Sequence, residues 1–553
     1  MGSDRILLGD EQVRRYVADG FLAFDTGLDS AFHDAVADEL SISMNEGSAL
    51  LGDNLLPRIP MLADLLDSPT VDGAMTSLLG EHYAWAPHRF PHNSEPLPAA
   101  DRSDDFDPFL NNARMGPGSI SGSGWHQDGH SKAGRSRWHT FRAANLFYFP
   151  QDTPLAKGPT RLLAGSHLYA NINLATPDQV VLRDIPQGTA ILADFDVGHA
   201  GTPNRTDTTR YMLKFVVLRT QSPTRATWNH QDPAWRTPDG LFTPHDLPQA
   251  WTSLWNWLRG APRHEHIAPP ASTEIPQLLA DLRSRDPQQR LAAMYDLAAL
   301  GGTAVPDMVE ALLATAGLDR HVAPTPDDMG YYGKSDDHLE RRFSPRQFVP
   351  EDAAVVLGTI GAPAVESLAA LLDHEDPWMR INAAYALGEA GPDAAGMVAD
   401  RIGELLDDPV AAVARAATDA LCTLPCFGSQ TVTRLRRLLS RDIDGGEEPA
   451  MGEPSLGGRW TKQNHMRYLA SLALLARVAG PNPPHGLEQA FTAGLDDETG
   501  YTQAIACKGL ERLGTRSGLK AAVRHLQTRR WDPNHIRLAD RPPRRAVNAS
   551  GRR

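Results

Sequence analysis

The chain has 553 residues and a net charge of −14, with 41% hydrophobic and 22% charged residues, as in ordinary soluble globular proteins. This length allows two or three domains, each with its own core. The acidic balance argues against a nucleic-acid partner, which requires a concentrated basic surface. No apolar run approaches the roughly 18 residues of a membrane span, and the first residues lack a signal-peptide core, so we expect a cytoplasmic protein.

The first hundred residues have the spacing of amphipathic helices. Apolar residues recur every three or four positions in 9–24, 31–40 and 61–80. The pattern changes over about 105–220, where short stretches rich in β-formers are separated by Gly, Pro and Ser. The strands expected there, within 141–149, 189–195 and 211–218, predict a sandwich or barrel.

A segment rich in Pro and Trp follows, over 220–260, with its indoles at Trp228, Trp235, Trp251, Trp255 and Trp257. So many indoles indicate a segment packed against the β-domain, and a ligand cage is the alternative.

From about residue 272 the chain is repetitive. Segments 285–305, 375–395 and 407–424 each carry Asp-Pro, then an Arg within a helix rich in Ala and Leu. This resembles HEAT repeats, which are paired helices of about 40 residues that bury their apolar faces by stacking. We therefore expect an all-α, HEAT-like helical solenoid over 272–530. A polar insertion, 319–347, interrupts it and is a candidate to dock over an active-site mouth. A basic tail, 531–553, ends the chain and could contact an anionic partner.

The strongest chemical signal is the sequence WHQDGH. Residues two apart on a strand point the same way, so His126 and Asp128 can face one metal ion. His199, expected just after a later strand, can complete a set of two imidazoles and one carboxylate, which suits iron(II). Such a facial set leaves three positions, two for 2-oxoglutarate and one for dioxygen. Arg210 offers the fixed cationic fork that the far carboxylate of 2-oxoglutarate needs.

A His-x-Asp triplet alone carries little information, and the chain contains two further examples. The residues 230–232 repeat His-Gln-Asp in the Trp-rich segment, and 374–376 read His-Glu-Asp at the start of a repeat helix. Neither is followed by a His and an Arg on consecutive strands. The alternative for the first triplet is a hydrogen-bonded core His beside a surface Asp.

Four motifs in this order resemble the phytanoyl-CoA dioxygenase family of iron(II)/2-oxoglutarate oxygenases, over residues 5–258. They are LGDEQVRRYVADGFLAF, WHQDGH, KGPTRLLAGSH and HAGTPNRTDTTR. The resemblance implies a double-stranded β-helix (jelly-roll) core with flanking helices. We therefore expect an oxygenase domain over 1–260.

The resemblance also implies roles for single residues. His126, Asp128 and His199 would bind iron, Arg210 would hold 2-oxoglutarate, and Asn204 would support that corner. The family often has Ser two residues after the distal His; here that residue is Gly201, and Thr202 is a candidate replacement.

Asp128 bears on the reaction. Related halogenases replace this carboxylate by Gly or Ala to admit chloride, so a carboxylate predicts hydroxylation. Desaturation or ring formation remains an alternative. Further candidates are Asn112 for 2-oxoglutarate and, on the substrate side, His88, Arg89, His92, Arg137 and Arg142; turn or structural roles are the alternatives.

These features lead to three hypotheses. The first is a hydroxylase of a small organic metabolite, such as one of secondary metabolism, with the repeats as scaffold, lid or docking surface. The second keeps this chemistry but has the repeats present a carrier-bound or peptidyl substrate. The third is an interaction protein without catalysis, against which the complete ligand set argues.

Overall fold

The computed structural model describes residues 5–45, 55–102, 107–109, 124–128, 135–170, 172, 175–318, 348–440, 462–480 and 482–529. Its strands are β1 (Phe21–Asp25), β2 (Ala84–Ser94), β3 (Ala143–Tyr148), β4 (Arg161–Leu163), β5 (Val180–Val181), β6 (Thr189–Asp194), β7 (His199–Ala200) and β8 (Arg210–Leu218). The first helices are α1 (Asp10–Asp19), α2 (Ser30–Asn45), α3 (Leu55–Arg58), α4 (Leu62–Leu66), α5 (Pro69–Leu79) and α6 (Pro248–Leu258). The predicted insertion 319–347 and tail 531–553 lie outside the described residues.

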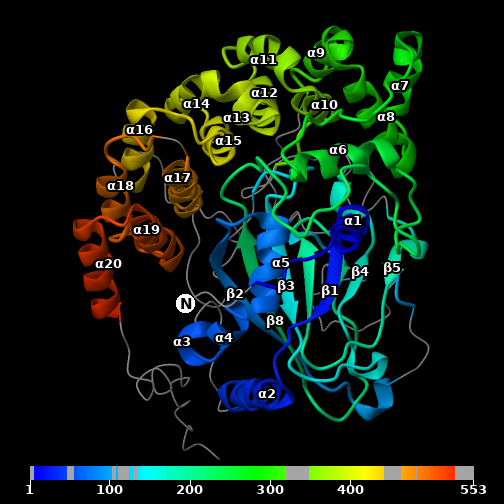
Figure 1. Ribbon diagram of the computed structural model, residues 1–553, viewed down its shortest axis with the longest axis vertical. Helices are drawn as coiled ribbons and strands as arrows, with labels where there is room; N and C mark the ends of the chain where they lie inside the picture. Colours follow the sequence, from blue (N-terminus) through cyan, green and yellow to red (C-terminus); the bar gives the residue numbers. More distant parts are fainter. Residues whose placement is uncertain are drawn as a thin grey trace, which may run out of the picture.

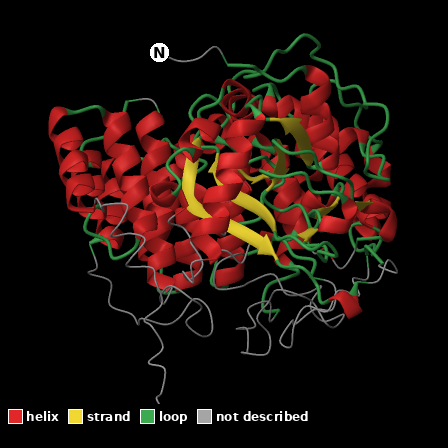
Figure 2. Cartoon of the chain, turned by 90° about the horizontal axis from the view of Figure 1, so that it is seen from below, coloured by secondary structure: helices red, strands yellow, loops and turns green. Residues whose placement is uncertain are grey.

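The strands form two antiparallel sheets. The larger has the order β1-β6-β3-β8-β2 and the smaller the order β5-β4-β7. Apolar side chains of both sheets meet in one cluster, which includes Phe147 of β3, Met212 of β8 and Leu162 of β4. The two sheets therefore face each other across a shared interior, with helices around them (Figure 2).

The three predicted strands are β3, β6 and β8, and their central positions in the large sheet explain their apolar sequences. Every residue of β3 and β8 is buried. The sheet also extends beyond the predicted core of 105–220, because β1 and β2 form its edges. Sequence reasoning missed β2 because it contains Pro87 and Pro91, which are unfavourable within central strands; on an edge strand prolines are tolerated.

The predicted helices before β2 are present, but two of the three patterns are broken. Over 9–24, α1 ends at Asp19 because Gly20 takes a left-handed conformation with φ 83°, and the residues after it form the strand β1. The pattern over 61–80 forms two helices, α4 and α5, because Ser68 caps α5 and Pro69 is its first residue. Side chains of α1 and α5 join the outward face of the large sheet in a buried core, including Tyr16, Leu78 and Leu213. These helices lie against that sheet in Figure 1.

The C-terminal helices are α7 (Ile275–Asp281), α8 (Pro287–Ala299), α9 (Val305–Leu313), α10 (Asp352–Ile360), α11 (Val365–Leu371), α12 (Pro377–Ala390), α13 (Pro392–Ala395), α14 (Ala399–Glu404), α15 (Ala411–Leu421), α16 (Ser429–Leu439), α17 (Lys462–Ala479), α18 (Leu487–Gly494), α19 (Gly500–Leu513) and α20 (Arg516–Arg529). Helices α8, α10, α12, α15, α17 and α19 pack in succession as an inner row. Figure 1 shows them as an arc around the β-domain. No single described helix is long and apolar enough to cross a membrane; the bent pair Asp352–Ile360 and Ala362–Leu371 passes by length and composition alone.

The repeated Asp-Pro motif starts two of the inner helices. Asp286 and Asp376 accept a hydrogen bond from the backbone N–H two residues on, and so cap α8 and α12. In the third copy, Asp408 likewise accepts the backbone N–H two residues on, from Val410 at 2.8 Å, and it also pairs with Arg380 of α12, at 2.8 Å. The motif therefore serves both helix initiation and the link between successive repeats.

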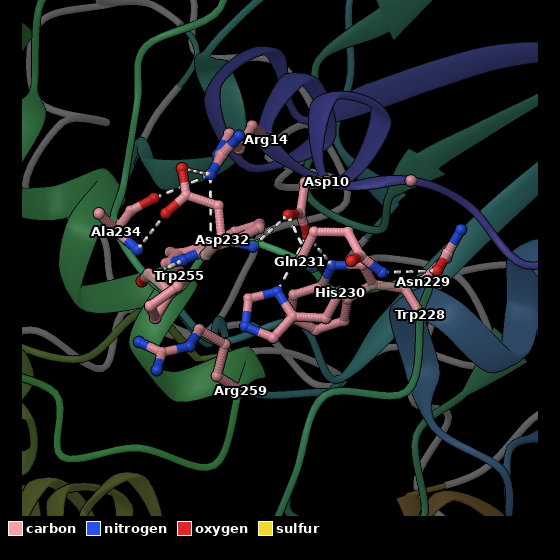
Figure 3. Close-up of polar contacts among 12 residues, drawn as sticks. Asp10, Arg14, Trp228, Asn229, His230, Gln231, Asp232, Ala234, Trp255 and Arg259 are labelled. Carbon is pink, nitrogen blue, oxygen red and sulfur yellow. Dashed lines mark hydrogen bonds and ion pairs between the residues drawn. The ribbon is translucent and has the colours of Figure 1, made fainter.

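The Trp-rich segment is attached to α1 through one carboxylate (Figure 3). Asp10 accepts hydrogen bonds from Trp228 Nε1 at 2.6 Å and His230 Nδ1 at 2.9 Å. It also accepts the backbone N–H groups of Gln231 at 3.0 Å and Asp232 at 2.8 Å. Burial by itself raises the pKa of Asp10, but these four donors outweigh it and lower the pKa from 3.8 to about 2. The indoles thus form a packed structural segment.

We predict that Asp10→Asn lowers stability by about 1–3 kcal/mol, because the amide NH₂ would face N–H donors. The stabilisation from the Asp10 carboxylate is fully present above pH 3.8 and is lost as the pH falls through about 2, since the unfolded chain takes up the proton first. The difference in thermal unfolding midpoint between the wild type and Asp10→Asn should therefore be smaller at about pH 3 than at pH 7. Asp29→Asn is the control, because Asp29 is exposed and accepts one such bond, from Phe32; equal losses in both variants would contradict the prediction.

Candidate metal centre

His126, Asp128 and His199 converge between the two sheets. The backbones of His126 and His199 exchange two hydrogen bonds, at 3.1 and 3.0 Å, which extends the smaller sheet past β7. Their ring centroids lie 4.2 Å apart. Asp128 Oδ1 is 3.8 Å from His126 Nε2, and Asp128 Oδ2 is 3.6 Å from His199 Nε2. One ligand atom of each residue lies within 4.8 Å of the others, and no second such group occurs among the described residues.

The two imidazoles are oriented for a metal ion. His126 Nδ1 lies 3.0 Å from the carbonyl of Gly124, and His199 Nδ1 lies 3.0 Å from that of Val197. Because a carbonyl only accepts, Nδ1 must donate in both rings, which leaves Nε2 with a lone pair. Burial lowers the pKa of both histidines, that of His199 to about 3. Both rings are therefore neutral at pH 7, as metal ligation requires.

The carboxylate of Asp128 is 1% exposed and is held by two further residues. Lys214 Nζ lies 3.0 and 2.9 Å from its two oxygens, and Asn145 Nδ2 donates to Oδ2 at 2.9 Å. Sequence reasoning missed both residues. A signal existed for Lys214, because a lysine inside the apolar strand YMLKFVVL is buried at a cost that requires a partner.

Arg210 lies on the same face of β8 as Lys214, since residues two apart share a face. It is 4% exposed, and its Nε and Nη1 atoms have no hydrogen-bond partner in the part of the chain that the structure describes. Burial lowers its pKa to about 10, so it remains a cation at neutral pH. A buried cation without a counter-charge is unfavourable unless an anion completes it, so Arg210 fits the carboxylate of 2-oxoglutarate. Thr202 Oγ1 is likewise buried without a partner.

Asn204 has a supporting position. Its Nδ2 donates to the carbonyls of Ser94 and Thr208, both at 2.8 Å, and its Oδ1 accepts from Thr206. Because Ser94 pairs with Arg210 in the sheet, the Asn204 amide fastens the turn that leads into β8.

The three predicted substrate residues on β2 have different surroundings in the structure. His92 pairs with Met212, so it points to the face that carries Arg210 and Lys214. Burial, then Lys214 and Arg210, lower its pKa well below the ordinary value. His88 Nδ1 instead forms a hydrogen bond with the hydroxyl of Tyr501, 2.6 Å away on α19. Arg89 pairs in register with Phe215 of β8.

The two other arginines contact neighbouring loops and the helical repeats. Arg137 donates Nη1 to the carbonyls of Tyr169 and Ala170, at 3.0 and 2.6 Å. Arg142 donates to Thr140 and Ser222, both at 3.0 Å, and its guanidinium lies 4.8 Å from the Trp257 ring centre. These contacts favour structural roles over the predicted substrate contacts. Asn112 lies outside the described residues.

The other two His-x-Asp triplets have structural roles. In 230–232, both the imidazole and backbone N–H groups bond to Asp10 (Figure 3). In 374–376, His374 accepts the backbone N–H of Asp376, which caps α12. Only the first triplet is joined by a second His.

Comparison with known families agrees with this site. Residues 36–212 match the family model "Phytanoyl-CoA dioxygenase (PhyH)", and residues 341–422 match HEAT repeats. The predicted pairing of these two units is confirmed, and with it a jelly-roll fold for the first and HEAT-like helices in the second part of the chain. The dioxygenase domain and the His126–Asp128–His199 group together confirm the predicted iron and 2-oxoglutarate.

Several solved structures match parts of this chain at low identity and low TM-score. "Non-heme monooxygenase, ThoJ-Ni complex" is 18% identical, over 43% of this chain and 88% of that chain, with a TM-score of 0.28. The "non-heme alpha ketoglutarate dependent carbocyclase SnoK from nogalamycin biosynthesis" is 14% identical, over 39% and 88%, with a TM-score of 0.29. EctD from S. alaskensis with 2-oxoglutarate and 5-hydroxyectoine is 13% identical, over 38% and 77%, with a TM-score of 0.29. Likenesses at these scores say nothing about this chain's substrate. No curated protein matches.

We predict that, in the metal-free protein, Asp128→Ala costs about 3–5 kcal/mol of stability, because it leaves Lys214 buried without its counter-charge. Adding Lys214→Met to that variant should recover part of the loss, since both charges are then gone. Thermal unfolding in the presence of a chelator measures both. If the double variant loses as much unfolding free energy as the two single variants together, the Asp128–Lys214 pair does not stabilise the fold.

Proposed function

We propose, on the premise that residues 36–212 form a phytanoyl-CoA dioxygenase domain, that the protein is an iron(II)- and 2-oxoglutarate-dependent oxygenase that hydroxylates a small organic metabolite. When bound, the iron would supply an oxidation in which one oxygen atom of dioxygen enters a C–H bond and the other enters succinate, with release of carbon dioxide from 2-oxoglutarate. His126, Asp128 and His199 would hold the metal.

The observation that carries the proposal is the spacing of charges along the interior. A neutral pair of imidazoles and a compensated carboxylate meet at one point. Arg210, four residues before Lys214 on β8, has two guanidinium atoms, Nε and Nη1, without a hydrogen-bond partner among the described residues. The first group suits a divalent cation, and Arg210 suits an anion. A ligand that chelates the metal and ends in a carboxylate satisfies both.

The surrounding side chains would keep water away. The shared interior is apolar and includes Phe21, Phe149, Ile191 and Met212. The Phe147 ring lies 5.2 Å from that of His199. Such walls limit unproductive reaction and hold one C–H bond near the metal. His92, on the same face, is the best-placed of the predicted substrate residues.

Asp128 supports hydroxylation over halogenation, because the carboxylate occupies the position that a halide would need. Desaturation and cyclisation share the hydrogen-abstraction step and stay as alternative outcomes.

A carrier-bound or peptidyl substrate held by the repeats is the second candidate. It is less favoured, because side chains on the inner row of helices contact the β-domain, as with Tyr501 and His88. We further propose a cytoplasmic protein with an oxygenase domain over 1–260 and a helical solenoid over 272–530.

Anaerobic addition of iron(II) and 2-oxoglutarate to the full chain should give a weak visible charge-transfer band, because the chelate forms only on a complete site. His199→Ala should abolish the band by removing one ligand. Absence of the band in the wild type would favour the non-catalytic interaction protein. Succinate release screened over free and carrier-bound metabolites would then identify the substrate.

Arg210→Met should weaken 2-oxoglutarate binding by about 100-fold, the equivalent of about 3 kcal/mol for a lost charge-assisted contact. Affinity for the metal alone should stay within about twofold, since Arg210 is not among the predicted ligands. Titration of the charge-transfer band measures the first and calorimetry with cobalt(II) the second. Arg183→Met, at an exposed arginine of the same domain, is the control; equal 2-oxoglutarate affinity in the two variants would refute this role.

A further inference from the structure

The segment 135–142, which joins the predicted metal ligand Asp128 to β3, contacts helices of the C-terminal half along most of its length. Arg135 and Asp419 of α15 form an ion pair at 2.6 Å, and their side chains are 5% and 3% exposed. The second oxygen of Asp419 accepts the backbone N–H of Ser136 at 2.7 Å. One buried carboxylate of the repeats therefore fixes two consecutive residues of the oxygenase domain.

The next residues contact three further parts of the helical region. Arg137 donates its backbone N–H to the carbonyl of Phe348, before α10, at 3.1 Å. Trp138 stacks on Tyr385 of α12, with ring centroids 4.5 Å apart and an interplanar angle of 24°. His139 Nδ1 lies 3.2 Å from the hydroxyl of Tyr295 on α8.

Thr140 ends this series at a second buried carboxylate. Its hydroxyl donates to Glu389 Oε2 of α12 at 3.1 Å. The other oxygen of Glu389 accepts from Arg263 Nη1 at 2.8 Å, and the Glu389 side chain is fully buried. The oxygenase side of this contact is cationic and the repeat side is anionic, so their charges are complementary.

The C-terminal end of the segment leads to the metal centre. There β3 begins at Ala143 and carries Asn145, which donates to Asp128. β3 also pairs with β8, which carries Lys214. A displacement of 135–142 would thus act on Asp128 through Asn145 and through Lys214.

We propose that the helical repeats are a structural part of the metal centre, with Asp419 and Glu389 as positioning residues that hold Asp128 in place through segment 135–142. This inference rests on the proposed function, because it requires a metal at the predicted site. It also assigns the inner face of the repeats to the chain's own oxygenase domain and not to a separate protein. Helices α8, α10, α12 and α15, which contact the segment or flank Phe348, are neighbours in the inner row (Figure 1).

The test measures cobalt(II) affinity of the full chain by calorimetry, with thermal unfolding in parallel. Asp419→Asn should weaken cobalt binding by about tenfold, at the low end of the effect of residues that support metal ligands. Asp408→Asn is the matched control, because it removes the ion pair with Arg380 within the repeats and leaves segment 135–142 untouched. The cobalt affinity of Asp408→Asn should stay within about twofold of the wild type, even if its thermal unfolding midpoint falls as far as that of Asp419→Asn.

A milder pair of substitutions tests the same positioning role if Asp419→Asn does not fold. Thr140→Val removes the hydrogen bond to Glu389 together with the one that Thr140 accepts from Arg142 Nε, and leaves both buried charges in place. Thr418→Val removes a bond within α15, to the carbonyl of Ala414. Thr140→Val should weaken cobalt binding several-fold and broaden the cobalt absorption bands, with Thr418→Val unchanged. Equal affinities in each variant and its control would overturn the inference. A wild type that binds no cobalt would instead overturn the proposed function.

Discussion

A carboxylate that is 1% exposed cannot remain ionised without compensation, and the site is organised around this constraint at Asp128. The compensation comes from two separate strands: Lys214 from β8 and Asn145 from β3. Since Lys214 and Asn145 engage the carboxylate oxygens, its orientation is set before any metal binds. The two sheets are thereby joined at the point where chemistry would occur.

The same solution recurs where the two halves of the chain meet. Asp419 and Glu389 are buried carboxylates, each with a guanidinium partner and a second donor from segment 135–142. Buried ion pairs contribute modestly to net stability, but removal of one partner is costly, so they favour one relative arrangement of the two halves over others. The helical region therefore constrains the catalytic domain rather than standing beside it as an independent module.

Local sequence patterns predicted many of the strands and helices, because the signals for them lie within a few neighbouring residues. The apolar strands β3, β6 and β8 and the capped helices α5, α8 and α12 follow from propensity, capping and periodicity. β2 escaped, because its prolines and histidines lack strand character and only its edge position beside β8 makes them acceptable. Among the candidate substrate residues, the sequence pattern could not distinguish His92 from His88. His92 faces the site, whereas His88 bonds to Tyr501, 413 residues later in the chain.

The sequence by itself determined which residue types could ligate a metal and bind 2-oxoglutarate, because motif spacing and strand alternation are properties of the local chain. Three His-x-Asp triplets were visible, and the later His and Arg selected one of them. Only the tertiary structure decided that Lys214 and Asn145 share the Asp128 carboxylate, and that Asp419 and Glu389 reach segment 135–142. Those contacts join residues up to 284 positions apart; their energies arise from burial, which no local pattern of charge or periodicity encodes.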